Sequence, residues 1–465
     1  MKNASSISRP FAAFISALVI LYCGSGALTP VLAQTKAPAV AEVAKPVTKA
    51  SGIAAGAVTT PAAPAPASVP ATPLTAEVIR IGLSGPFTGA SAPLGISMRE
   101  GVRIAVEEIN LYVGGVLGKK IVLVERDDQA VATSGGAVAN DLINGQRVIA
   151  TVGIVNTGVG LSSIDVYQKL HIPLIIAVST GTSLTQKFAP PAAPENYIFR
   201  VAPRTDVETA FLVDHIVGRA GISNIAILAD STPYGESGKV DLEKALALKK
   251  LKPVSVGRFN LGDTDMSAQL KAAKAAGAEA IIMYGIGPEL AAIVKSRDAM
   301  QWKVATFSGW TASMQTFIDQ AGKSAENVMM PQTFIAQSVN VRHRALVTRY
   351  AERTGSTVIP SAMAAAQGYD AMRILYNAIQ NAASQDGAKI KTALENIQSI
   401  EGAITTHRAP FNATDHDAIS ASMLVMGKIV KGRTEYAFSE DANRSIVLRR
   451  KQASLDTNDM RKNFK

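Results

Sequence analysis

Side chains able to bind metals or catalyse reactions are spread widely along this sequence. No pair of histidines has the spacing of metal ligands on one helix; the five are His171, His215, His343, His407 and His416. Two acidic turns, Asp263–Asp265 and Asp415–Asp417, contain ligand types for a divalent cation, but neither continues with the spacing of a calcium loop. We therefore expect no bound metal, and we expect structural or surface roles for the histidines.

Motifs of covalent and phosphate-transfer catalysis are absent from the sequence. It contains no Gly-x-Ser-x-Gly nucleophile turn, no glycine-rich phosphate fingerprint after its first predicted strand and no plausible catalytic triad. Its single cysteine, Cys23, excludes internal disulfides, cysteine-rich zinc modules and redox pairs. We expect a protein that is not an enzyme and needs no cofactor, with a doubly wound enzyme as the weakest alternative.

The length and composition indicate a globular chain with more than one domain. With 465 residues, the chain is long enough for two hydrophobic cores, and 47% of its residues are hydrophobic while only 18% are charged. Part of the net charge of +10 comes from residues 441–465, whose own net charge is +4. This segment has one aromatic residue, Phe464, whereas nucleic-acid binding favours aromatics interleaved with basic residues. We expect a solvated basic tail and no nucleic-acid partner.

Residues 1–33 have the pattern of a cleaved export signal. Two basic residues precede the apolar run Phe11–Leu21, and small residues at the −3 and −1 positions predict cleavage after Ala33. Retention as a membrane anchor is an alternative, because the longer run 11–28 nearly reaches the length of a bilayer span. Lipoprotein processing at Cys23 is another, although a bulky tyrosine precedes it.

Residues 34–76 follow as an Ala/Pro-rich tether. They are nearly all Ala, Pro, Val, Thr, Lys and Ser, which gives too little large apolar surface to offset the entropy of ordering. The folded part is therefore expected to begin near Glu77.

From Glu77 onward, strand-like apolar runs alternate with amphipathic helices. Strands are predicted at 78–83, 120–124, 148–152, 173–178, 225–229, 254–259, 280–284, 304–308 and 422–430. Helices are predicted at 98–109, 134–144, 160–170, 207–220, 236–249, 266–276, 288–300, 342–354, 363–382 and 390–397. This alternation predicts an α/β protein with two doubly wound, Rossmann-like lobes, which bind ligands at the carboxyl ends of their strands.

Several short motifs follow one another along residues 78–429. They are Ile81–Gly89 with Gly95, Ala105–Asn110 with Gly114–Gly115, Asp127–Asp128, Ile172–Ile175, Ser179–Thr180 with Leu184–Thr185, Tyr197–Arg200, Tyr234–Gly235 and Gly368–Ala371. Their order and spacing resemble those of the substrate-binding proteins of ABC importers, in the leucine/isoleucine/valine-binding branch. The resemblance implies a type I periplasmic binding fold, in which a three-segment hinge joins two lobes that close on a small ligand.

The resemblance also implies how the chain is divided between the lobes. Lobe 1 would comprise residues 77–202 and 334–415, and lobe 2 residues 203–333 and 416–440. It further implies a monomer in the periplasm that docks on an ABC permease in the inner membrane.

Carried over by position, the family's ligand contacts fall on both lobes. They are Leu94, Thr157, Val178 and Thr180 in lobe 1, and Tyr234, Ile286 and Trp310 in lobe 2. Thr157 and Thr180 each follow a predicted strand, where a hydroxyl and the N–H groups of a helix start can hold a carboxylate. A plain helix cap is the alternative for either threonine. Tyr234 could cover a ligand with its ring, or be an ordinary core or surface tyrosine.

The sequence departs from the family at the position that pairs the ligand's ammonium. Amino-acid binders of this family place an acidic residue where this chain has Trp310, and often a tyrosine where it has Ile286 or Gly287. A buried ammonium without a carboxylate partner costs several kcal/mol, so we expect an aromatic or aliphatic carboxylate rather than a standard α-amino acid. Core packing of Trp310, or a shifted alignment, is the alternative.

These features predict an extracytoplasmic solute-binding protein of an ABC importer. It would capture a small carboxylate or amino-acid-like ligand by hinge closure, without chemistry. The alternative is a ligand-sensing module that uses the same fold to report its ligand to a signalling partner.

Overall fold

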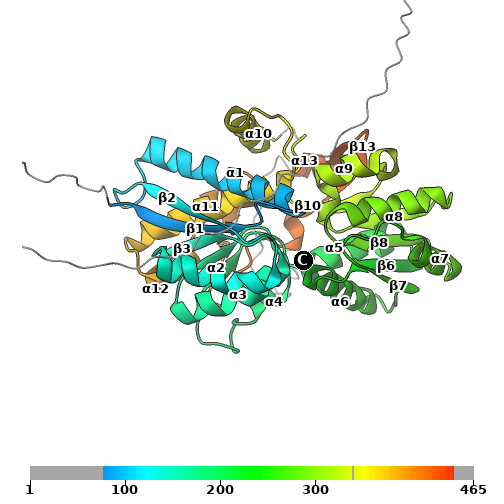
Figure 1. Cartoon of the computed structure of the whole chain (residues 1–465), viewed down its shortest axis with the longest axis horizontal. Helices are drawn as coiled ribbons and strands as arrows, with labels where there is room; N and C mark the ends of the chain where they lie inside the picture. The colour runs from blue at the N-terminus through cyan, green and yellow to red at the C-terminus, as the bar shows by residue number, and fades with distance from the viewer. Residues whose placement is uncertain (1–76, 338–339, 445–465) are drawn as a thin grey trace, which may run out of the picture. The chain divides into compact units, whose positions relative to one another are not determined.

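The computed structural model describes residues 77–337 and 340–444. The predicted export signal (1–33), the predicted tether (34–76) and all but the first four residues of the predicted basic tail (441–465) lie outside the described residues. In the described ranges, no helix combines the length and apolarity needed to cross a bilayer. The described elements form two α/β lobes, each built on its own sheet (Figure 1).

Lobe 1 is built on five parallel strands in the order β2-β1-β3-β4-β5. Their bounds are β1 Ile79–Gly85, β2 Ile121–Asp127, β3 Ala150–Gly153, β4 Leu174–Ile176 and β5 Ile198–Arg200. The helices of this lobe are α1 Ala92–Glu108, α2 Gly135–Asn140, α3 Thr157–Leu170, α4 Ser183–Gln186, α10 Val341–Thr354, α11 Ala362–Ala382 and α12 Gly387–Glu395. Both β3 and β4 are buried along their whole length, which explains why neither carries a charged residue.

Lobe 2 is built on seven strands in the order β14-β13-β10-β9-β8-β6-β7. Their bounds are β6 Ile225–Asp230, β7 Ser255–Phe259, β8 Ala280–Tyr284, β9 Ala305–Ser308, β10 Met329–Gln332, β13 Val425–Val430 and β14 Arg433–Tyr436. Strands β6 to β10 are parallel, and β13 and β14 extend the sheet with antiparallel pairing. The helices are α5 Thr205–Val213, α6 Pro233–Leu248, α7 Ser267–Ala275, α8 Pro288–Ala299, α9 Gln315–Ala321 and α13 Ser439–Arg444. A separate hairpin pairs β11 Ser399–Glu401 with β12 Thr406–Arg408.

The sequence predicted the main strands but not the elements beside the lobe boundaries. Every predicted strand overlaps a strand of the structure, although β11, β12 and β14 have no predicted counterpart, and the doubly wound α/β class is confirmed. Strands β5 and β10 were not predicted, because β5 is only three residues long and ends in Arg200, and β10 contains Pro331, which cannot donate to a ladder. Helix α3 begins at Thr157 rather than Gly160, since two glycines in its first turn weaken the sequence pattern.

Helices α1 and α11 pack closely because glycines lie at their contact. A Cβ atom on Gly101 would collide with the carbonyl oxygen of Ala365, and one on Gly368 would collide with the carbonyl oxygen of Met98. At the start of α11, the Ser361 N–H donates to the hydroxyl of Ser97 at 2.9 Å. These contacts hold the middle of α1, the helix that follows the carboxyl end of β1, against α11.

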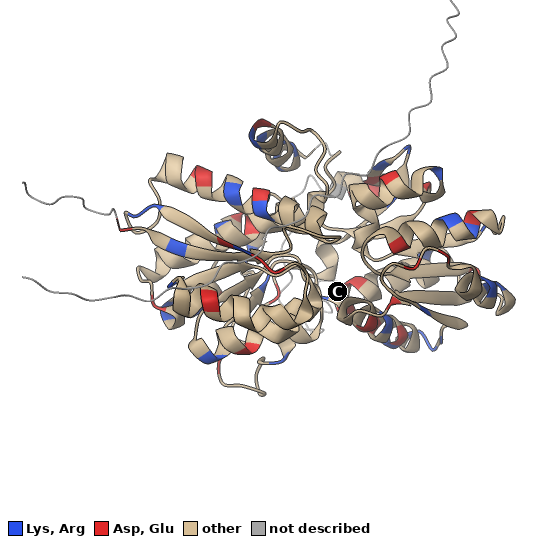
Figure 2. Cartoon of the chain, viewed as in Figure 1, with Lys and Arg blue, Asp and Glu red and all other residues tan. Residues whose placement is uncertain are grey.

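Charged side chains on the outer helices of lobe 1 are paired with each other. Figure 2 shows acidic and basic residues alternating along α1. Arg103 Nε lies 2.7 Å from Glu125 Oε1, and Arg353 Nε lies 2.7 Å from Glu100 Oε2. The basic residues of this helix therefore do not form a stripe of one charge, as a nucleic-acid site requires.

The chain passes between the lobes three times: after β5, after β10 and before β13. The first and third crossings are joined by an isolated parallel β-bridge between Arg200 and Asp417. The Arg200 N–H donates to the carbonyl of His416 at 2.9 Å, and the Ala418 N–H donates to the carbonyl of Arg200 at 2.8 Å. The two crossings are therefore joined by main-chain hydrogen bonds.

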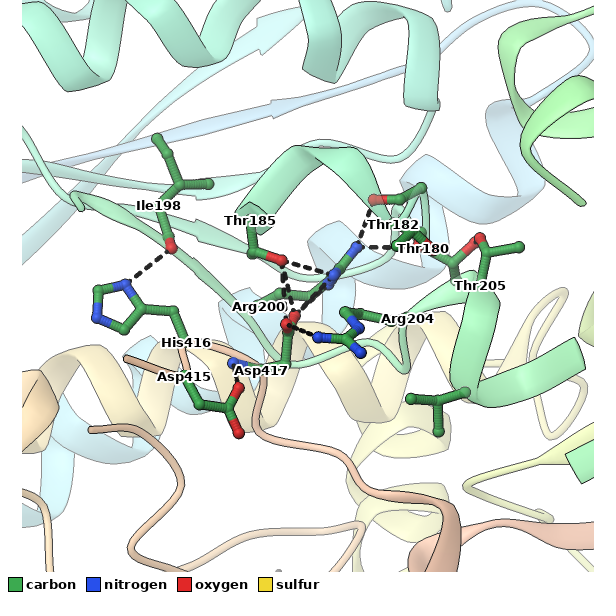
Figure 3. A network of polar contacts seen from close by, with 12 residues as sticks. Thr180, Thr182, Thr185, Ile198, Arg200, Arg204, Thr205, Asp415, His416 and Asp417 are labelled. Carbon is green, nitrogen blue, oxygen red and sulfur yellow. Dashed lines mark hydrogen bonds and ion pairs between the residues drawn. The ribbon is translucent and has the colours of Figure 1, made fainter. Parts of the chain in front are cut away.

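A buried ion pair reinforces this joint (Figure 3). The guanidinium of Arg200, which is 0% exposed, lies with Nη2 2.7 Å from Asp417 Oδ1. Its Nη1 donates to the carbonyls of Thr180 at 2.8 Å and Gly181 at 2.7 Å, and its Nη2 donates to the hydroxyl of Thr185 at 2.7 Å. One side chain thus connects β5, the turn after β4 and the third crossing.

Replacing Arg200 with methionine should lower the free energy of unfolding by about 3–5 kcal/mol, because it leaves Asp417 buried without its main partner. Urea unfolding measures the change. The control is Arg126→Met, since Arg126 and Asp141 form a pair whose side chains are 34% and 44% exposed, and this change should cost at most about 1 kcal/mol. Equal losses in the two variants would contradict a central role for the buried pair.

Candidate functional site

Each predicted contact residue stands after the carboxyl end of a parallel strand, where α/β proteins bind ligands. With the strand that each follows, they are Leu94 (β1), Thr157 (β3), Val178 and Thr180 (β4), Tyr234 (β6), Ile286 (β8) and Trp310 (β9). The first four follow strands of the lobe 1 sheet, and the other three follow strands of the lobe 2 sheet.

Buried apolar side chains connect the lobes at these strand ends. Leu94, Val178 and Trp310 belong to one buried cluster, although Trp310 follows a strand of the other sheet. Ile286 packs against this cluster and against the neighbouring cluster that contains Tyr234. Apart from Ile286, these side chains are at most 4% exposed. The structure therefore brings the predicted apolar and aromatic residues of both lobes into one connected region.

Thr157 is the first residue of α3, and its hydroxyl does not act as a helix cap. The hydroxyl oxygen lies 3.1 Å from that of Ser179, which follows β4. The N-cap position belongs to Asn156, whose side chain makes no capping bond. Gly181 allows this close approach, because a Cβ atom there would contact the Thr157 side chain. Two hydroxyls therefore meet at the start of a long helix, where N–H groups lack acceptors within the helix.

Thr180 lies beside the first crossing between the lobes. Its hydroxyl accepts a hydrogen bond from the Thr205 hydroxyl at 3.0 Å, and its carbonyl accepts from the Thr205 N–H at 2.8 Å. Because the hydroxyl acts as the acceptor, its own O–H can donate to a ligand. Thr180 also precedes α4 by three residues, so it does not cap that helix.

Three aromatic residues, Tyr234, Tyr284 and Trp310, form what we call the aromatic wall of lobe 2. The rings of Tyr234 and Tyr284 have centroids 4.8 Å apart. The Trp310 indole N–H and the Tyr234 hydroxyl are buried without a hydrogen-bond partner of good geometry in the described residues, although Tyr284 and Thr311 lie beside Tyr234. Both groups can donate to a ligand oxygen.

A buried acid, Glu208 in α5, accepts hydrogen bonds from two residues of this wall. Its Oε1 accepts the Trp310 main-chain N–H at 2.8 Å, and its Oε2 accepts the Tyr284 hydroxyl at 3.1 Å. The side chain is 0% exposed, and burial raises the pKa of its carboxyl to about 7 despite these two bonds. Because the folded-state pKa lies above the ordinary value, Glu208 favours the folded state at low pH and this contribution is lost as pH rises through about 7.

Glu208 was not predicted from the sequence as a site residue, yet a signal for it exists. In the predicted helix 207–220, Glu208 shares the apolar stripe of Leu212 and Ile216, which are both buried. An acid within such a stripe indicates a buried, partnered carboxylate. The family alignment did not reveal it, because it placed the expected acid at the position of Trp310.

The two acidic turns have structural partners. Asp417 pairs with Arg200, and Asp265 accepts the N–H of Ser267 at 2.9 Å. Asp263 Oδ2 accepts the Asn260 N–H at 2.8 Å. Within the described part of the chain, no three His, Cys, Asp or Glu side chains gather in a way that could bind a metal ion.

A cavity of about 320 Å³ lies between α1, α10 and α11, at a different place in lobe 1. The charged groups of its lining are paired, with Arg373 Nη1 3.6 Å and Arg349 Nε 3.8 Å from the carboxylate of Glu108. Glu108 is the last residue of α1, so the cavity lies at the opposite end of that helix from the strand ends. The carboxyl ends of the strands are therefore the better candidate for the site.

Comparison with known proteins shows the family to which this chain belongs. The family model for periplasmic binding proteins matches residues 78–433. The Leu/Ile/Val-binding protein homolog 3 of Brucella melitensis is 27% identical over 330 residues, which cover 70% of this chain and 86% of the relative. These relatives are solute-binding proteins and not enzymes.

Two solved structures share the fold. A type 1 periplasmic binding protein from Bordetella pertussis aligns with a TM-score of 0.71 and 24% identity, covering 77% of this chain and 100% of that one. An ABC transporter solute-binding protein from R. palustris in complex with benzoate aligns with a TM-score of 0.67 and 17% identity, covering 78% and 96%. From its family match, its relatives and its fold, this chain belongs to the type I periplasmic binding proteins of the leucine/isoleucine/valine-binding family.

Proposed function

We propose that this protein captures a small carboxylate between its lobes in the periplasm and delivers it, as a monomer, to an ABC permease in the inner membrane. The observation that carries the proposal is that two kinds of group follow strand ends which one buried cluster, containing Val178 and Trp310, connects across the lobes. The hydroxyls of Thr157 and Thr180 belong to lobe 1, and the unpaired donors of Tyr234 and Trp310 belong to lobe 2. A carboxylate with an apolar body satisfies both sides.

The carboxylate of the ligand would bind in lobe 1. There the start of α3 contributes main-chain N–H groups and the positive end of a helix dipole, and Thr157 and Ser179 contribute hydroxyls. Leu94 and Val178, which are buried nearby in the same cluster, suit an aliphatic or aromatic body. The benzoate bound to the R. palustris protein of the same fold is a ligand of this chemistry.

A standard α-amino acid is the second candidate ligand, and Glu208 is the observation that favours it. The buried carboxylate could balance a ligand ammonium from behind the position of Trp310. However, both of its oxygens already accept hydrogen bonds, and with a pKa of about 7 it is only partly ionised at neutral pH. The monocarboxylate therefore remains the first candidate.

Capture would work by hinge closure. The contact residues lie on both sheets and are nearly all buried, so a ligand reaches them only when the lobes separate. A ligand that touches both lobes stabilises the closed form by the contacts it makes only there. A sensory protein would use the same closure to signal. Ligand uptake by cells that lack this protein distinguishes the two functions, because loss of an importer component lowers uptake directly.

A panel of carboxylates tests the ligand class. Benzoate, 4-hydroxybenzoate and hexanoate at a hundredfold excess over the dissociation constant should stabilise the folded protein by about 3 kcal/mol, which raises the melting temperature by several degrees. Leucine and valine should leave it unchanged. Differential scanning fluorimetry measures the shifts, and strong stabilisation by leucine with none by the acids would reverse the order of the two candidates.

The role of Trp310 can be tested against the other tryptophan of the chain. Trp310→Ala should weaken binding of the stabilising acid at least about tenfold, because it removes a ring and an indole donor from the aromatic wall. Trp302→Ala should change affinity less than about twofold, since Trp302 packs against a separate apolar cluster of lobe 2. Isothermal titration calorimetry measures both, and equal effects would place Trp310 outside the site.

A further inference from the structure

Glu208 is a buried acid next to the aromatic wall. The capture of a carboxylate, as proposed above, assigns it no role. It contacts two of the three wall residues directly, through Trp310 N and the Tyr284 hydroxyl. Tyr284 in turn packs on Tyr234. A single carboxyl therefore sets the position of the Trp310 main chain and of both tyrosine rings.

Among the residues that the structure describes, no basic side chain bonds to the Glu208 carboxyl. At the start of α5, Arg204 is paired with Asp206 at 2.8 Å, and in α6, Lys244 is paired with Asp241 at 3.1 Å. The titratable groups that interact with it are Tyr234 and Tyr284, which are neutral donors, and Asp230 at the end of β6 lies beside Tyr234. The strand β10 contributes Gln332 and the turn Ala421–Met423 contributes no titratable group.

Because no cation in the described part of the chain neutralises it, the charge on Glu208 would repel an anionic group of a ligand bound on the other side of the aromatic wall. In a buried setting, with an effective dielectric constant of about 20, a like charge within about 8–10 Å weakens binding by roughly tenfold or more. Protonation removes this repulsion. Because the carboxyl is buried with a raised pKa, the protonated form is accessible near neutral pH.

We propose that Glu208 is a specificity-determining residue, which excludes ligands with a second anionic group and binds one proton when a monocarboxylate enters. This inference rests on the proposed function. In the bound state the ligand carboxylate lies toward the threonines of lobe 1, its uncharged end faces the aromatic wall, and Glu208 is neutral. A dicarboxylate would place its second charge against the wall and against Glu208.

The first experiment compares benzoate with terephthalate, which carries a second carboxylate opposite the first. The full mature protein should bind benzoate about tenfold more weakly at pH 8 than at pH 6, although benzoate itself is fully ionised throughout. It should bind terephthalate at least tenfold more weakly than benzoate at pH 8. Glu208→Gln should lose the pH dependence and reduce this discrimination to about threefold or less.

Calorimetry in two buffers of different ionisation enthalpy measures the proton directly. At pH 7.5 the wild-type protein should take up about three quarters of a proton per benzoate, because that fraction of Glu208 is ionised before binding, and Glu208→Gln should take up none. If Glu208 had a purely structural role, Glu208→Gln would change the affinity for benzoate but would change neither its pH dependence nor the number of protons taken up. This measurement on the wild type also tests the inference if the variant does not fold.

The matched control is Asp128→Asn in lobe 1. Asp128 is also a buried acid, with a pKa raised to about 6 by burial, but it bonds to Ser84 and not to the aromatic wall. The control should keep the pH profile, the proton uptake and the discrimination of the wild type. Residual pH dependence in Glu208→Gln would assign the effect to Asp230 and overturn the inference.

The outcomes separate the two proposals. If neither benzoate nor hexanoate binds the wild-type protein at any pH, both the proposed function and the inference are wrong. If benzoate binds with a flat pH profile, or terephthalate binds as tightly as benzoate, only the inference is wrong.

Discussion

The ion pair between Arg200 and Asp417 is the interaction on which the arrangement of the site depends. Arg200 ends β5, and its side chain also holds the carbonyls of Thr180 and Gly181. Two segments that are more than two hundred residues apart in the sequence thus meet at the turn that carries a predicted ligand contact. The cost of burying both charges is offset because hydrogen bonds surround them on every side.

The effect of this pair extends into lobe 2 through α5. Thr205, the first residue of that helix, donates both its hydroxyl and its N–H to Thr180. One turn later, Glu208 reaches Trp310 and Tyr284. A continuous series of polar contacts therefore joins the hinge, the hydroxyls of lobe 1 and the aromatic wall of lobe 2. The groups that would touch a ligand are thus connected to the same residues that hold the first crossing in place.

Local patterns predicted the fold better than they predicted the site. Buried parallel strands such as β8 are visible as continuous apolar runs, because both faces of such a strand are covered. Strand β5 has only three residues and ends in Arg200, and β10 contains Pro331, so neither is visible as a continuous apolar run. The resemblance to a family predicted a ligand contact at Trp310, but gave no indication of Glu208. Glu208 was hidden because its partners lie in β8 and after β9, far from it in sequence.

The bridge between the first and third crossings also limits how the lobes can move. Main-chain bonds on both sides of Arg200 join the two segments at one point. A motion between the lobes that keeps these bonds must move both segments together, since sliding one past the other breaks the bonds. Two of the three crossings then behave as a single joint. Such a joint leaves the chain fewer arrangements to lose on closure than independent connections would, so more of the contact energy of a ligand remains available for affinity.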